Sequence, residues 1–255
     1  MSFPKELNLD SNKPMAASGK PSINRYRADN SSYQGGDVIR IEIPCGRNGQ
    51  YLFAMDSFIE ARIKANYTCV ASVGGTTAPN SELFIDQSVY SLFNRMRVIH
   101  GSTVIEDTLY TNRLWTCLYD LQVIEVERRG DTITKLVNDS SISAAGVPTA
   151  GQVFNNHLSG TTFKNTNTAG TADTQFYDFS FVIPSAVLGS LSSKAIPLGL
   201  MGASSIYLEL ELAPANVAFV AFNGLGTGAG PVQGSIICNS YTIQDIYYNG
   251  KVNVA

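Results

Sequence analysis

Short stretches in which apolar and polar residues alternate with a period of two recur along this 255-residue chain. Isoleucine occupies every second position from 39 to 43, and Ile or Ala does so from 59 to 65. Similar alternation appears at 177–183 and 206–212. A period of two places the apolar side chains on one face of an extended strand. Such strands bury that face against a second sheet or a helix, so the pattern predicts a layered β protein.

Further strand signals complete the predicted topology. Residues 95–99 and 103–106 flank His100-Gly101-Ser102, a connection with the length and the glycine of a tight hairpin. A final strand region runs from 235 to 248. With seven or eight strands and long connections, the sequence predicts an all-β fold: an antiparallel eight-stranded jelly-roll sandwich with one amphipathic helix and long interstrand loops.

Helical spacing is clear in one region, where we expect Thr111 to cap the helix and Arg128–Gly130 to end it. Its apolar residues recur at intervals of three and four and predict a face that packs on the sheets: Leu114, Cys117, Leu118, Leu121 and Ile124. Residues 184–191 suggest a second, short helix.

The predicted domain organisation has two parts. Residues 1–36 are rich in Ser, Asn, Pro and Gly and are expected to form an extended N-terminal arm, either a flexible leader or a segment that orders on a neighbouring subunit. Residues 37–255 form the jelly-roll domain. Within it, residues 138–175 carry few charges and many Thr, Asn and Gly, which predicts a long loop insertion.

Composition excludes several function classes. A net charge of −3 argues against electrostatic binding of nucleic acid, so no specific nucleic-acid partner is expected. The first ten residues lack the apolar segment of a secretory signal, and no stretch reaches the roughly 18 apolar residues of a membrane span. We therefore expect synthesis in a cytosol-like compartment without secretion. The four cysteines lack C-x-x-C spacing and are expected to be buried reduced thiols: Cys45, Cys69, Cys117 and Cys238.

No catalytic constellation emerges from the sequence. Only His100 and His157 could offer imidazole ligands, too few for a typical jelly-roll metal site. Glu209 and Glu211 share a strand face, an arrangement more common on a solvated surface than in an acid–base pair. The glycine-rich stretch at 224–230 lacks the spacing of a phosphate loop. We predict no catalytic, cofactor-binding or metal-binding residues, no cofactor and no enzymatic activity.

The segments that surround the alternating strands resemble a known family. These segments are Phe181-Val182-Ile183-Pro184-Ser185, Lys194-Ala195-Ile196-Pro197-Leu198, the strand 206–212, and the opening region from Gly36 to Ile63. They are similar to the first jelly roll of the double-jelly-roll major capsid proteins of icosahedral DNA viruses, the group shared by virophages, polinton-like elements and nucleocytoplasmic large DNA viruses. Chains of that family carry two barrels in tandem. The resemblance therefore fits either the first half of a longer polypeptide or a shell built from single barrels.

The resemblance implies a structural viral capsid protein that self-assembles into an icosahedral shell. Its partners would be copies of itself, as homotrimeric capsomers and neighbouring capsomers, with minor capsid or vertex proteins as further candidates. Its location would be the virion, after synthesis in the host cytosol. Two alternatives remain open: a receptor- or glycan-binding jelly roll of a fibre, spike or lectin, and a glycan-active or metal-dependent enzyme.

Overall fold

The principal strands pair in a nested order, in which the first strand pairs with the last and the second with the second-last. The computed structural model describes residues 21–46, 49–70, 81–85, 89–122, 162–166, 170–171, 176–222 and 235–254. Eight principal strands lie in these residues: β1 (Pro21–Arg27), β3 (Val38–Ile43), β4 (Gln50–Val70), β6 (Phe93–His100), β7 (Thr103–Leu109), β10 (Tyr177–Phe181), β12 (Ile206–Leu212) and β14 (Ser235–Val254). β1 pairs with β14, β3 with β12, β4 with β10 and β6 with β7, all antiparallel. This nesting is the double Greek key of a jelly roll, which confirms the predicted fold.

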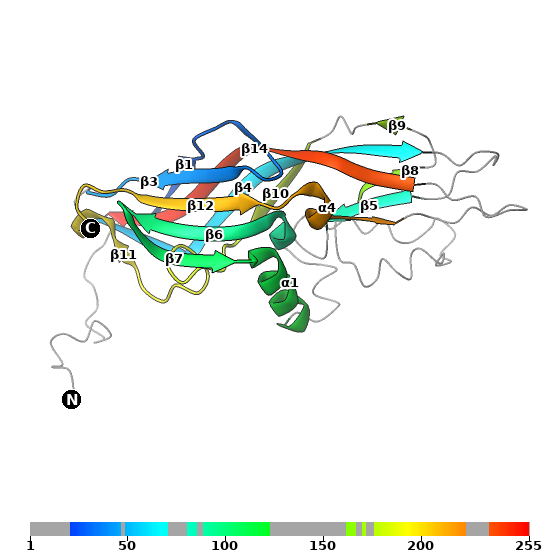
Figure 1. The fold of residues 1–255 in the computed structure, drawn as a ribbon. Helices are drawn as coiled ribbons and strands as arrows, with labels where there is room; N and C mark the ends of the chain where they lie inside the picture. Colours follow the sequence, from blue (N-terminus) through cyan, green and yellow to red (C-terminus); the bar gives the residue numbers. More distant parts are fainter. Residues whose placement is uncertain are drawn as a thin grey trace, which may run out of the picture.

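The eight strands form two layers (Figure 1). Sheet A has the order β1-β14-β4-β10, with three short strands attached at its margins: β2 (Ser32–Gln34), β9 (Gly170–Thr171) and β11 (Ile196–Pro197). Sheet B has the order β3-β12-β6-β7. Connections that cross between the layers also carry the 3-10 helices η2 (Val89–Leu92) and η3 (Leu198–Leu200) and the short helix α4 (Ala215–Ala218).

The apolar residues that alternate with polar ones in the sequence are the buried residues of the strands. In β3 the isoleucines at 39, 41 and 43 are buried and the residues between them are exposed. In β12 every second residue from Ile206 to Leu212 is buried. The predicted apolar face of β4, from Ile59 to Ala65, is also buried. The apolar faces of the two sheets therefore meet in one core.

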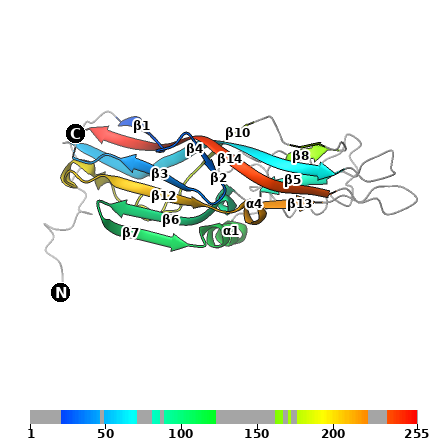
Figure 2. The same cartoon turned by 45° about the horizontal axis from the view of Figure 1, so that its top comes forward.

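One end of the molecule extends beyond this sandwich. β4 and β14 are 21 and 20 residues long and run side by side past the other principal strands. Beside this extension lies a three-stranded sheet of order β13-β5-β8, made of β5 (Ser81–Ile85), β8 (Thr162–Thr166) and β13 (Phe219–Phe222) (Figure 2). Leu83, Ile85 and Phe219 are buried there. Three connections far apart in sequence thus extend the core of the sandwich.

The expected N-terminal arm is partly wrong. β1 pairs with β14 over its whole length, and β2 pairs with β14 further along, so residues 21–27 and 32–34 belong to sheet A rather than to an arm. Apolar periodicity missed β1 because it is an edge strand with both faces largely exposed. Residues 1–20 lie outside the described residues. The loop predicted at 138–175 contains β8 and β9, and its remaining residues also lie outside the described part.

The helix α1 (Thr111–Gln122) is present, but its predicted buried face is wrong at two positions. Leu114 and Cys117, expected to pack on the sheets, are exposed. Leu118 is half-buried, and the side chain of Leu121 and residue Ile124 lie outside the described part. Thr111 is the first residue of the helix, and its hydroxyl donates a hydrogen bond to the Thr108 carbonyl rather than capping the helix. Buried Thr111 and Asn112 and half-buried Trp115 face the protein instead. The predicted end at 128–130 lies outside the described residues.

Residues 184–192 form a compact turn segment rather than the short helix expected there. The Ser185 hydroxyl accepts hydrogen bonds from the backbone N–H groups of Val187 and Leu188 and donates one to Glu106 of β7. Tyr248 donates a hydrogen bond to the Leu188 carbonyl. Side-chain hydrogen bonds of this kind compete with helix formation. The segment therefore ties the chain after β10 to both sheets.

Candidate interaction surfaces

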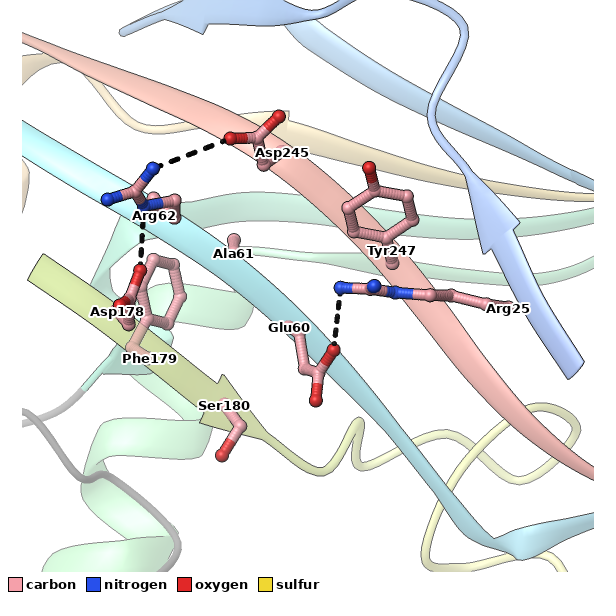
Figure 3. A pocket seen from close by; sticks show the side chains of 9 residues that line it. All are labelled: Arg25, Glu60, Ala61, Arg62, Asp178, Phe179, Ser180, Asp245 and Tyr247. Atoms are coloured by element: carbon pink, nitrogen blue, oxygen red, sulfur yellow. Dashed lines mark hydrogen bonds and ion pairs between the residues drawn. The ribbon is translucent and has the colours of Figure 1, made fainter. Parts of the chain in front are cut away.

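A shallow groove lies on the outer face of sheet A (Figure 3). Its volume is about 590 Å³, and its lining comes from four strands: Arg25, Glu60, Ala61, Arg62, Asp178, Phe179, Ser180, Asp245 and Tyr247. Arg25 forms an ion pair of 3.0 Å with Glu60, and its guanidinium lies 3.8 Å from the Tyr247 ring centroid. Arg62 lies between two carboxylates, 2.7 Å from Asp178 and 3.8 Å from Asp245. The charges of the groove are thus largely balanced within it.

Backbone geometry places one of these carboxylates. Asp245 lies in an irregularity of β14 between Gln244 and Tyr247 and has a positive φ of 51°. Aspartate tolerates this left-handed conformation better than most residues. The extra residues of such a bulge re-aim a side chain. The bulge brings Asp245 to Arg62, a pairing that strand alternation alone would not predict.

The outer face of sheet B carries a second ionic network. Glu209 of β12 stands opposite Arg40 of β3 and Arg97 of β6 in the strand register. Its carboxylate lies 2.7 Å from Arg97 and 3.8 Å from Arg40, with the side chain only 14% exposed. Because opposite charges directly across a sheet stabilise the pairing, this row links three strands.

The network continues to the edge of sheet B. Asn94 donates a hydrogen bond of 2.9 Å to Glu211. Arg95 donates two hydrogen bonds to Asp107 of β7, at 2.8 and 2.6 Å. The hydrogen bond from Arg95 is the main cause that lowers the pKa of Asp107 below its ordinary value. Every strand of sheet B is therefore joined to its neighbours by charged or polar side chains.

The residues that the sequence offered as candidates for catalysis or metal binding can now be placed in the structure. Glu209 and Glu211 share a face as predicted, but each carboxylate is engaged by a neighbouring side chain. His100 lies at the end of β6 with Nε2 3.2 Å from the Met201 carbonyl oxygen. His157 and the glycine-rich stretch 224–230 lie outside the described residues. Within the described ranges, no group of three or more His, Cys, Asp or Glu residues is arranged to hold a metal ion.

The cysteines are only partly as expected. Cys45, Cys117 and Cys238 are free thiols, which agrees with the prediction of reduced cysteines. Cys45 and Cys238 are half-buried, and Cys117 is exposed, so the expectation of burial is wrong for Cys117. Burial raises the pKa of Cys238 to about 12 and also raises that of Cys45. The side chain of Cys69 lies outside the described part.

Exposed apolar residues along β7 and α1 are a feature that sequence reasoning missed. Ile105, Leu109, Tyr110 and Leu114 all expose close to half or more of their surface. Helical spacing of apolar residues predicts that a helix has an apolar face, but it does not show which face packs against the sheets. Trp115 of α1 packs against the core.

No helix among the described residues is long and apolar enough to span a bilayer. No protein-family model and no curated protein matches the sequence. Solved structures do match. One is a chain of the Sputnik virophage, determined by cryo-electron microscopy, with a TM-score of 0.53 and 11% identity over 100% of this chain and 52% of that one. The fold is shared with a virophage protein.

Two further structures overlap less well. The major capsid protein of mavirus has a TM-score of 0.47 and 12% identity over 100% of this chain and 52% of its own. The Faustovirus major capsid protein has a TM-score of 0.46 and 10% identity over 98% of this chain and 57% of its own. The chain thus spans about half the length of the structures it matches. Of these three structures, the Sputnik chain has the highest TM-score.

Proposed function

We propose that this chain is a structural subunit of a viral capsid that self-assembles into an icosahedral shell. The observation that carries the proposal is the fold: eight strands in nested order, in a structure that matches a chain of the Sputnik virophage over its whole length. The resemblance noted in the sequence points to the same class independently of the strand order. The proposal assigns no reaction to the chain.

The surfaces are suited to contacts between proteins. Both sheets present balanced rows of charge on their outer faces, and sheet B adds exposed apolar residues along one edge. A shell multiplies each weak contact over many copies, so modest interfaces are sufficient for assembly. The proposed partners are copies of this chain in homotrimeric capsomers, with neighbouring capsomers and minor capsid or vertex proteins around them. The proposed location is the virion, after synthesis in the host cytosol.

The test is the mass of the purified protein in solution across a concentration and salt series, with electron microscopy of each fraction. Trimers, capsomer arrays or closed shells are the expected result. A protein that stays monomeric under every condition would refute self-assembly by this chain. If that monomer also bound an oligosaccharide on a glycan array, the receptor- or glycan-binding alternative would replace the proposal.

A further inference from the structure

Exposed apolar side chains occur at both ends of β7 and continue into the start of α1. We define the β7–α1 patch as Val104, Ile105, Leu109, Tyr110 and Leu114, whose exposed fractions are 49%, 48%, 57%, 69% and 46%. Single exposed apolar residues are common on protein surfaces, whereas groups of them often mark a functional surface. Five such residues in eleven positions therefore require an explanation.

The patch lies at an open sheet edge. Among the described strands, β7 pairs with β6 alone, so its other side presents unpaired backbone groups. The opposite edge of sheet B is partly covered, because Ala28 bridges to Ile41 and the Asp29 N–H donates to the Arg40 carbonyl. Natural proteins protect edge strands with lysine, proline or a covering segment, and Thr103–Leu109 contains neither residue. This edge is better suited to a covering partner than to solvent.

The charges around the patch favour a second copy of this chain as the covering partner. Asp107 is held by two hydrogen bonds from Arg95, and Glu106 accepts hydrogen bonds from the Ser185 hydroxyl and the Ala186 N–H. The two carboxylates of β7 are thus already engaged within the subunit. In a contact with two-fold symmetry, such as one between neighbouring capsomers, a surface meets its own copy, so a patch with strong net charge would repel itself. A patch whose charges are paired within the subunit avoids this repulsion.

We propose that the β7–α1 patch is a contact surface between copies of this chain. This inference rests on the proposed function and names the surface that carries part of the assembly. An interface of standard size buries about 800 Å² per partner, with an apolar centre and a polar rim. The exposed apolar residues of the patch would form part of such a centre, and the Arg95–Asp107 pair beside them would form part of the rim.

The first experiment compares self-association of the wild-type chain with that of the double variant Leu109→Asp/Leu114→Asp by sedimentation velocity over a concentration series. Both side chains are exposed, so far-UV circular dichroism and the melting curve should stay close to wild type. The matched control is Ile23→Asp, because Ile23 is 66% exposed and lies on β1, an edge strand of sheet A, whereas the patch lies at the β7 edge of sheet B. We expect the concentration at half-association to rise at least tenfold in the double variant and to change less than threefold in the control. An unchanged double variant, or an equal loss in the control, would overturn the inference.

Cys117 gives a second readout without any substitution. It is exposed and lies three residues after Leu114, hence on the same face of α1. Alkylation with iodoacetamide, read for each cysteine by peptide mass spectrometry, should be at least fivefold slower at Cys117 in assembled wild-type protein than in the dissociated double variant. Wild-type protein that assembles while Cys117 stays fully reactive would overturn this inference and leave the proposed function standing. Wild-type protein that never assembles would refute both.

Discussion

Replacing Gly189 with alanine should be one of the most damaging small changes in this protein. An ideal Cβ at this position would lie 1.7 Å from the Ile183 carbonyl oxygen and 2.8 Å from the Ser185 backbone nitrogen. Neither neighbour is a flexible side chain, so the turn segment 184–192 itself must move. That movement breaks the 2.8 Å hydrogen bond from the Ser190 N–H to the Ile183 carbonyl and displaces fully buried Leu188.

The magnitude follows from these losses. Overpacking of a tight site costs about 1–3 kcal/mol, and a buried polar group left without its partner costs about 1–3 kcal/mol more. Gly189→Ala should therefore lower the free energy of unfolding by about 2–6 kcal/mol, a large part of the ~5–15 kcal/mol of an ordinary domain. Urea unfolding followed by far-UV circular dichroism measures this difference.

The matched control is Gly36→Ala. Gly36 has a φ of 94°, and a Cβ there would meet nothing within 4 Å. Its substitution costs only the left-handed backbone conformation, about 1–2 kcal/mol. The reasoning is refuted if Gly189→Ala destabilises the protein no more than this control, because the cost would then be conformational rather than a steric clash.

Three further predictions concern buried and paired groups. Tyr241→Phe should lower the free energy of unfolding by about 1–2 kcal/mol, because its hydroxyl donates to a buried backbone carbonyl that would lose its partner; an unchanged melting temperature would contradict this. Iodoacetamide should modify exposed Cys117 well before Cys238, whose pKa is raised to about 12 so that little thiolate is present at pH 8; equal rates in the dissociated protein would refute the assignment. Arg95 lowers the pKa of Asp107, so the stability gained from this carboxylate is present at neutral pH and is lost as the pH falls through its folded-state pKa. The melting temperature of wild type should exceed that of Asp107→Asn at pH 7, and the difference should vanish in strong acid; a difference that persists there would show that the charge is not its source.

Strands with one buried face could be read directly from the sequence. In β3 and β12 the alternation of isoleucine and leucine with charged residues coincides with the alternation of burial. This works because neighbouring side chains of a strand point to opposite sides, a property that depends on the strand alone. The same reasoning placed Glu209 and Glu211 on one outward face.

Elements whose environment depends on distant segments were not readable in this way. β1 lacks a buried face, since it lies at the edge of sheet A, so it gave no periodic signal. In α1 the apolar spacing was present, yet the buried residues are Thr111 and Asn112 on another side. For the turn segment 184–192, the decisive constraint is the carbonyl of Ile183 against Gly189, which only the folded backbone brings together.

The sequence by itself determined that the chain is made of strands with one apolar face and that two such sheets must meet, because strand periodicity and hydrophobic burial are local in origin. Tertiary structure alone decided that the first strand pairs with the last, that Asp245 reaches Arg62, and that β7 remains an open apolar edge. Those outcomes depend on pairing between residues up to more than 200 positions apart, such as Pro21 with Asn253. Such pairing is fixed by register and packing over the whole sandwich, which no short stretch of sequence records.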